Sequence, residues 1–248
     1  MILQRLANSI RKQDWFTVFI ETLIVVLGVF LGLQVNNWNE ARQARGKEAL
    51  YLSELIDDLN ADLGEIDQVR RTAEIRMGAL EQVLALVKIE PRRTLTYDGR
   101  SFTFDQAPPF HSDDPYEGNA EITATPHLDG SRETFQALIS TGDIGLIRDR
   151  RLTRQVQTYY ADMTEVNSLE ESIHDVAETV NDSRRRLGAS LTGRVTIEDL
   201  GALAAGDPQF RAELETYWTA SAFQVRAMNG LRREAEALID AIEVERKK

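Results

Sequence analysis

A run of 20 residues, FTVFIETLIVVLGVFLGLQV from Phe16 to Val35, contains one charged residue, Glu21, and no proline. As a helix that rises ~1.5 Å per residue, it would extend about 30 Å, which matches the hydrocarbon core of a bilayer. Trp15 and Trp38 stand just outside its two ends, where indole rings gather at the headgroup level of membranes. The sequence therefore predicts one transmembrane helix over residues 16–35, because no second apolar run approaches ~18 residues.

This run has two other interpretations: the core helix of a soluble protein and a cleaved signal peptide. A signal peptide would agree with the basic residues near the start, Arg5, Arg11 and Lys12. However, Leu33 to Asn37 contains nothing like the Ala-x-Ala pattern of a cleavage site. The pattern favours a signal anchor that stays in the membrane.

The predicted regions are a short cytoplasmic N-terminus (residues 1–15), the transmembrane helix (16–35) and an extracytoplasmic helical domain (36–248). Basic residues are balanced across the span, with three before it and three soon after it, Arg42, Arg45 and Lys47. A short basic segment ahead of a first span usually stays in the cytoplasm. We therefore expect a single-pass protein of the cell inner membrane whose C-terminal domain lies in the periplasm.

One face of the predicted span carries small and polar side chains. At 100° per residue, this face gathers Thr17, Glu21, Gly28, Gly32 and a helical Asn39. The Gly-x-x-x-Gly pair would let another helix approach closely, and an acid inside a membrane suggests a partner. The alternative is that Glu21 reaches back to the headgroups and that the glycines reflect the ordinary composition of such helices.

The residues that would hold the helix at a fixed depth flank the span. The predicted interface anchors are Trp15, Asn36, Asn37, Trp38 and Asn39.

Apolar residues recur with a spacing of about 3.5 residues in three long segments, which is the period of packed helices. The first stripe runs from Leu52 to Val87, the second from Leu152 to Val180 and the third from Phe210 to Ile242. The members are Leu52, Leu55, Leu59, Leu63, Ile66, Val69, Ala73, Met77, Leu80, Leu84 and Val87; Leu152, Val156, Tyr159, Met163, Val166, Leu169, Ile173, Val176 and Val180; and Phe210, Leu214, Tyr217, Ser221, Val225, Met228, Leu231, Ala235, Leu238 and Ile242. Such stripes must be covered, either by each other or by a second copy of the chain.

Capping residues predict where the helices begin. Asp149 would cap the second long helix, and Asp207 followed by Pro208 would start the third. Shorter helices are expected at Ser131–Thr141, closed by Gly142, and at Ile197–Ala205, capped by Thr196 and ended by Gly206.

Between Pro91 and Gly130 the helical pattern disappears. Thr94 to Phe104, centred on Asp98-Gly99, predicts a hairpin, and the proline-rich part after it predicts no regular element. The expected fold class is mainly α: one N-terminal transmembrane helix continuing into an elongated antiparallel helical bundle or coiled coil, with the irregular loop and hairpin of residues 91–130 inserted.

The charge and the absence of cysteine exclude several kinds of site. Acidic residues outnumber basic ones by 40 to 29, which argues against nucleic acid as a partner. The chain has no cysteine, so disulfides, zinc-thiolate sites and cysteine nucleophiles are ruled out.

No pattern of catalytic residues stands out. His111, with Asp113, Asp114 and Glu117 nearby, could form a loop metal site, although a solvated turn accounts for the same residues. Acid clusters such as Asp57, Asp58 and Asp62 are expected on the solvated face of a helix. His174 is expected at the surface, and the Tyr159-Tyr160 pair is expected in the core. We therefore predict no catalytic, cofactor-binding or metal-binding residue.

Two stretches carry a resemblance. LIVVLGVFLGLQVNNWNEARQ with ALYLSELIDDLNADL resembles an uncharacterised family of bacterial single-span membrane proteins. Its members have a Gln-(Val/Ile)-Asn-Asn-Trp-Asn-Glu signature after the span. TFQALISTGDIGLIRDRRLTRQVQTYY is similar to a second block of that family. The resemblance implies the topology and a bacterial origin, but no activity.

Three functions remain open. We expect a non-enzymatic protein without cofactor that acts by association with the lipid bilayer and with other membrane proteins, as an accessory or scaffold subunit or as a homo-oligomer. The second hypothesis is an extracytoplasmic sensor or small-ligand-binding helical module, which would need a separate transducer. The third, a membrane-tethered hydrolase, would need a metal at His111.

Overall fold

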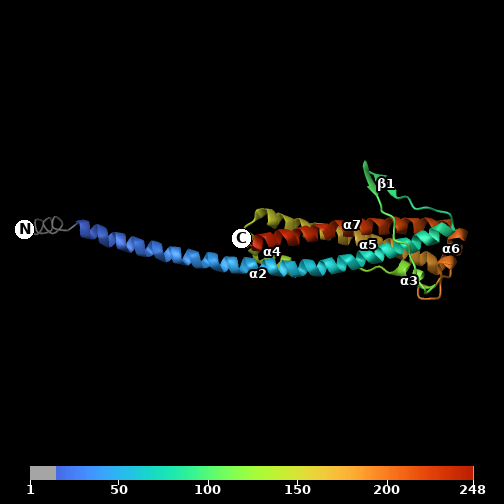
Figure 1. Ribbon diagram of the computed structural model, residues 1–248, viewed down its shortest axis with the longest axis horizontal. Helices are drawn as coiled ribbons and strands as arrows, with labels where there is room; N and C mark the ends of the chain where they lie inside the picture. Colours follow the sequence, from blue (N-terminus) through green and yellow to red (C-terminus); the bar gives the residue numbers. More distant parts are fainter. Residues whose placement is uncertain (1–14, 248) are drawn as a thin grey trace, which may run out of the picture. The chain divides into compact units, whose positions relative to one another are not determined.

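The computed structural model describes the backbone of residues 15–247 and the side chains of residues 19–247, so residues 1–14 of the predicted N-terminus (1–15) lie outside it. The elements are α2 (Trp15–Leu86), β1 (Thr94–Tyr97), β2 (Arg100–Thr103), α3 (Glu117–Thr123), α4 (Glu133–Thr141), the 3-10 helix η1 (Asp143–Leu146), α5 (Arg150–Arg186), α6 (Ile197–Gly206) and α7 (Pro208–Arg246) (Figure 1). The chain divides into an N-terminal unit, Met1–Leu50, and a helical unit, Tyr51–Lys248. The fold is thus mainly helical with one small strand pair, and α2 contributes residues to both units.

Three helical segments build the core of the helical unit: α2 from residue 51 onward, α5 and α7. Every residue of the three apolar stripes predicted from the sequence is buried or half-buried. The buried side chains form two clusters, one around Leu80, Trp218 and Phe210 and the other around Leu55, Tyr159 and Leu238. The helical period therefore identified the packed face of each helix correctly.

Helices α5 and α7 run in opposite directions. Gln224 Nε2 donates to Glu170 Oε1 at 3.0 Å, and Arg186 Nη1 donates to Asp207 Oδ2 at 2.9 Å. Residue numbers thus rise along α5 as they fall along the facing side of α7. This pair agrees with the antiparallel arrangement expected from the sequence.

Helix α2 is also antiparallel to α7. Arg76 Nε donates to Ser221 Oγ at 2.8 Å, and Trp218 Nε1 donates to Glu81 Oε1 at 3.0 Å. Since both α2 and α5 oppose α7, they run parallel to each other. The expectation of a wholly antiparallel bundle is wrong for this pair, because the chain from α2 to α5 travels back along the bundle before α5 begins.

Acidic side chains of α2 hold this returning segment in place. Backbone N–H groups of Gly130, Ser131 and Thr134 donate to Glu65 Oε2 at 3.0 Å, Asp62 Oδ1 at 2.6 Å and Asp58 Oδ2 at 3.3 Å, respectively. Asp62 is fully buried and Asp58 is half-buried, so placing these two acids on the solvated face was wrong. The physical reason is that the N–H groups of a loop packed on a helix need acceptors.

The helix ends follow the predicted capping chemistry. The carboxylates of Asp149 and Asp207 each accept two backbone N–H groups at the starts of α5 and α7. Thr196 and Asp199 form a capping box at the start of α6, and Gly142 ends α4 in the left-handed region with φ 77°.

The segment between α2 and α4 contains the predicted hairpin and one unpredicted helix. Strands β1 and β2 pair antiparallel, with Thr94 opposite Thr103. The short α3 lies where no regular element was expected, and its Gly118, Asn119 and Ile122 are buried. A Cβ on Gly118 would lie 2.7 Å from the Ile197 side chain, so α3 is held by close packing that composition did not indicate.

Candidate functional site

The apolar part of α2 in the N-terminal unit is exposed from residue 19 to residue 35, apart from Ile20, which is half-buried. The exposed large side chains are Phe19, Leu23, Ile24, Val25, Val26, Leu27, Val29, Phe30, Leu31, Leu33 and Val35. An 18-residue window of this helix has a mean hydropathy of 1.9, and none of it is buried. This helix is therefore long and apolar enough to cross a membrane.

The polar stripe predicted on this helix lies in open space. Glu21, Gly28 and Gly32 are exposed, and a Cβ built on either glycine meets no atom within 4 Å. The side chain of Thr17 lies outside the described residues, as does that of Trp15. The described part of the stripe can thus accept a neighbouring helix without rearrangement of its own chain.

The predicted interface residues are exposed on the next turns of α2. Trp38 is 61% exposed, and the Arg42 guanidinium lies 5.9 Å from the centre of its ring. Asn36 Nδ2 donates to Glu40 Oε1 at 2.7 Å, while Asn37 and Asn39 face outward. An exposed indole with a cation beside it has the amphipathic character that suits a headgroup layer.

A buried polar network joins the three long helices of the helical unit. The Arg76 guanidinium is fully buried and donates to Ser221 Oγ at 2.8 Å, to the Ala124 carbonyl at 2.7 Å and to Gln224 Oε1. It also lies 5.0 Å from the centre of the Tyr217 ring. Burial lowers the pKa of this arginine from its ordinary value.

Glu170 on α5 continues this network. Its carboxylate accepts Gln224 Nε2 at 3.0 Å and the Leu128 N–H at 2.9 Å, and His127 Nδ1 lies 3.1 Å from it. Sequence reasoning missed both Arg76 and Glu170. Their burial was indicated only by their positions relative to the apolar stripes. Arg76 lies three residues after Ala73 of the first stripe, and Glu170 directly follows Leu169 of the second.

A second buried arginine lies on α5. Arg184 donates to Asn181 Oδ1 at 3.3 Å and to Asn119 Oδ1 on α3. Burial lowers the pKa of Arg184 to about 10. These contacts fix α3 against α5. Arg184 therefore has a structural role, as Arg76 does.

The acids near His111 are used in the turn that begins α3. Ser112 Oγ donates to Glu117, and Asp114 Oδ1 accepts the Tyr116 N–H at 2.9 Å. Within residues 19–247, no three His, Asp or Glu side chains lie close enough together to hold a metal ion. The solvated-turn interpretation describes this loop, and His174 is exposed as expected.

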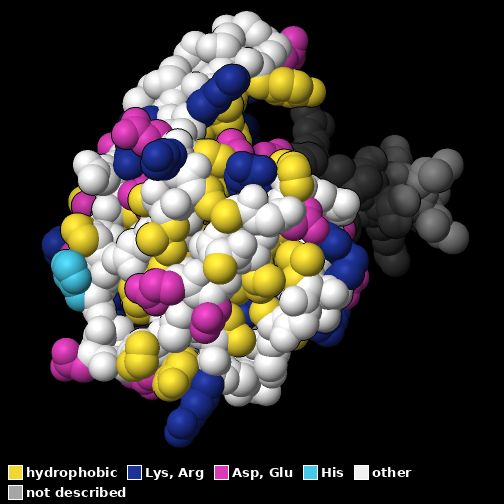
Figure 2. Space-filling model, turned by 90° about the vertical axis from the view of Figure 1, so that its right-hand side faces the viewer, with side chains coloured by type: hydrophobic (Ala, Val, Ile, Leu, Met, Phe, Trp, Pro, Cys, Tyr) yellow, Lys and Arg dark blue, Asp and Glu magenta, His cyan; other side chains and the backbone are white. Residues whose placement is uncertain are grey.

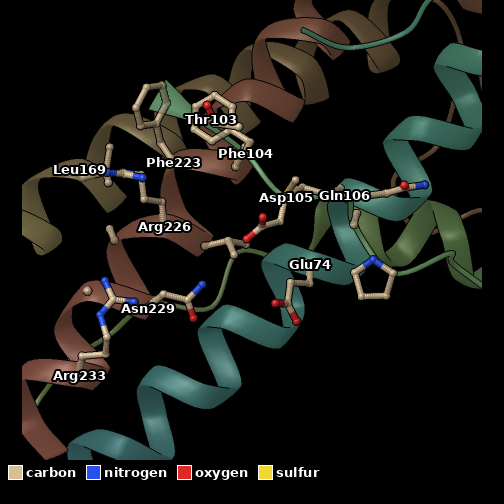
Figure 3. Close-up of a pocket in the computed structure, with 17 residues that line it drawn as sticks. Glu74, Thr103, Phe104, Asp105, Gln106, Leu169, Phe223, Arg226, Asn229 and Arg233 are labelled. Atoms are coloured by element: carbon tan, nitrogen blue, oxygen red, sulfur yellow. The ribbon is translucent and has the colours of Figure 1, made fainter. Parts of the chain in front are cut away.

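A pocket of about 460 Å³ opens between α7, α2 and the chain that follows β2 (Figure 3). Its lining is apolar at Met77, Phe104 and Ala222, which are buried, and at Leu169 and Phe223, which are half-buried. Rings of Phe104 and Phe223 contact edge to face with centroids 4.9 Å apart. Such a floor is pre-formed, and the volume falls in the range of ~300–1,000 Å³ that small-molecule sites have.

Charged side chains of opposite sign stand on the two sides of this pocket. Arg226, Asn229 and Arg233 project from α7, whereas Glu74 projects from α2 and Asp105 from the chain after β2 (Figure 3). This arrangement could not be predicted from the sequence, because its residues come from segments far apart in the chain.

One face of the helical unit shows no such separation of charge. On the face drawn in Figure 2, Lys and Arg side chains alternate with Asp and Glu, with hydrophobic side chains between them. That face has mixed charge rather than the concentrated positive charge that phosphate backbones attract.

Comparison with known proteins gives one match. The model of DUF6090, a family of unknown function, matches residues 21–90, which cover most of α2. Residues 134–160, the second block of the resemblance noted from the sequence, lie outside this match. No curated protein and no solved structure matches the chain.

Proposed function

We propose that this protein is a non-enzymatic, single-pass membrane protein that acts by association, as an accessory or scaffold subunit of a membrane complex. The observation that carries the proposal is the open stripe of Glu21, Gly28 and Gly32 on an unburied apolar helix. Glycines at this spacing allow close approach of helix backbones, and a carboxyl group in lipid gains stability from a partner.

The proposed location is the inner membrane of a bacterium, with the helical unit in the periplasm. The short basic N-terminus ahead of the span supports this orientation. Trp38 and the asparagines around it would then mark the periplasmic headgroup layer.

Capture from membranes in mild detergent tests association. The variant Gly28→Leu/Gly32→Leu should lose its co-purifying membrane partner, or its self-association, because the added side chains would hold a second helix away. A Cβ at either position meets no described atom within 4 Å, so a loss of association reports on a partner. The control is Val26→Leu, about 160° away from Gly28 around the helix. A wild-type protein that returns only as a monomer without partners would contradict the proposal.

The second candidate function is a helical module that binds a small ligand outside the cytoplasm. The pocket in Figure 3 favours it, because its apolar floor and polar rim are those of a small-molecule site. A ligand that binds only the folded state raises the melting temperature. Screening the full-length protein against a panel of metabolites by thermal shift tests this function, and no stabilisation by any compound would reject it.

A further inference from the structure

We infer that the pocket in Figure 3 takes a zwitterion with an apolar side chain, namely a hydrophobic α-amino acid or a short peptide with free ends. This inference rests on the second candidate function and assigns its ligand class. Three features of the pocket carry it: a rigid apolar floor, a basic side and an acidic side.

The floor is fixed by aromatic contacts that exist without a ligand. Phe104 meets Phe223 at 4.9 Å and Trp218 at 6.2 Å, both nearly edge to face. Met77 and Ala222, each at most 3% exposed, complete the apolar surface. A leucine or phenylalanine side chain that binds here moves from water onto an apolar surface. Because this surface is already ordered, binding avoids the entropic cost of forming the site.

The basic side lies on one face of α7. Arg226 and Arg233 are two helical turns apart, and Asn229 lies between them. Arg226 lies 5.6 Å from the centre of the Phe102 ring, a contact that restrains its guanidinium. Asn229 and Arg233 make no side-chain hydrogen bond with any described residue, and the charge of Arg233 interacts with Glu234, the next residue of α7. Guanidinium and amide donors are therefore free for a carboxylate, which arginine binds in a bidentate manner.

The acidic side lies opposite, on α2 and the chain after β2. The Asp105 carboxylate makes no hydrogen bond or ion pair within the described residues. Glu74 Oε1 accepts Arg70 Nη1 at 2.7 Å, which leaves Oε2 for a further donor. An ammonium group has three donors and can bind more than one carboxylate on the same side of a pocket.

The opposite charges decide between ligand classes. A simple anion would pair with Arg226 and Arg233 but would face Asp105 and Glu74, and a simple cation would face the arginines. Only a ligand that carries both charges pairs with both sides, and its apolar side chain then lies on the floor of the pocket. The volume of about 460 Å³ accommodates a molecule of this size.

The test uses the full-length protein in detergent, with thermal shift followed by titration calorimetry. The probes are phenylalanine and the dipeptide Leu-Leu, each compared with its N-acetyl and its C-terminal amide derivative. The zwitterions should raise the melting temperature, and removing either charge should weaken binding about tenfold or more, as loss of a charged hydrogen-bonding pair does.

Matched variants place the binding at this pocket. Arg226→Gln/Arg233→Gln should bind the zwitterion and its amide equally weakly. Glu74→Gln/Asp105→Asn should bind the zwitterion and its N-acetyl form equally weakly. Arg211→Gln, on α7 outside the pocket, should bind like wild type. All these residues lie at least partly at the surface, and circular dichroism would verify that each variant is folded.

Two outcomes separate the inference from the function on which it rests. If a sugar, a nucleotide or a fatty acid stabilises the protein while the zwitterions do not, the ligand class is wrong and the ligand-binding function stands. If no compound of any class stabilises the protein, both are wrong. Zwitterion binding that the pocket variants leave unchanged would also overturn the inference.

Discussion

The Tyr159 hydroxyl on α5 donates a 2.8 Å hydrogen bond to Asp62 Oδ2 on α2, and both side chains are at most 1% exposed. The other oxygen of Asp62 accepts the Ser131 N–H at 2.6 Å. One buried carboxylate therefore joins two parallel helices to the chain that returns between them.

Removal of this carboxylate should destabilise the helical unit strongly. We expect Asp62→Ala to lower the free energy of unfolding by about 2–4 kcal/mol, because two buried donors lose their acceptor. Tyr159→Phe should cost only about 1 kcal/mol, since the Ser131 N–H keeps its partner. Urea denaturation measures both, with the exposed Asp57→Ala as the control. Equal effects of Asp62→Ala and Asp57→Ala would contradict this role.

Two glycines of α2 should respond oppositely to alanine. A Cβ on Gly78 would lie 2.6 Å from the Pro108 carbonyl oxygen and 3.1 Å from the Phe110 nitrogen, both of which are backbone atoms. Gly78→Ala should therefore destabilise by roughly 1–3 kcal/mol. Gly64 has open space around it, so Gly64→Ala should raise the free energy of unfolding by about 0.5–1 kcal/mol, because alanine loses less conformational freedom than glycine when the helix forms. Stabilisation of the protein by both substitutions would show that the loop does not pack on Gly78.

A carboxyl pair between α5 and α7 should make stability depend on pH. The pKa of Glu234 is raised from 4.5 to about 7. The largest cause is partial burial, followed by the hydrogen bond with Asp162 and the charge of Asp162. Between these values the folded protein keeps a proton that the unfolded chain has released. The free energy of unfolding should therefore fall as pH rises through this range.

Denaturation at about pH 5 and about pH 8 measures this dependence. The loss of stability between the two should be smaller in Glu234→Gln than in wild type. Burial also raises the pKa of Asp62, but that contribution is common to both proteins and cancels in the comparison. Glu215→Gln, an exposed position on α7, should behave like wild type. An identical loss in Glu234→Gln and wild type would refute the role of this pair.

The local chemistry of the helices could be predicted from the sequence, but the neighbours of each helix could not. Asp149, Thr196 and the Asp207-Pro208 pair marked true helix starts because capping depends only on adjacent residues. Apolar periodicity identifies the buried face of a helix and says nothing of the direction of its partner. The parallel pairing of α2 and α5 therefore needed the structure.

The polar interior and the pocket were also beyond sequence reasoning. Asp62 and Arg76 look like surface residues because charged side chains usually are, and only the partners on the returning chain and on α7 explain their burial. Likewise, Asp105 and Arg226 share a pocket only because the chain after β2 packs against α7. The apolar N-terminal part of α2 is the opposite case, since composition and length are sufficient to predict a helix that is long and apolar enough to cross a membrane.

The proposed orientation can be tested with single cysteines, because the chain has none of its own. Tyr97→Cys, at a hairpin position that is 78% exposed, should react with an impermeant maleimide when the outer membrane alone is opened. Ser9→Cys should react only after the inner membrane is disrupted. The reverse pattern would place the helical unit in the cytoplasm.

The account depends most on residues 16–35 remaining in the lipid as an uncleaved anchor. Alkaline carbonate extraction of membranes, followed by intact-mass measurement of the protein, tests this claim most directly. We predict that the protein stays in the membrane pellet and retains the residues ahead of Asn36. Recovery of a soluble protein that has lost those residues would contradict the account.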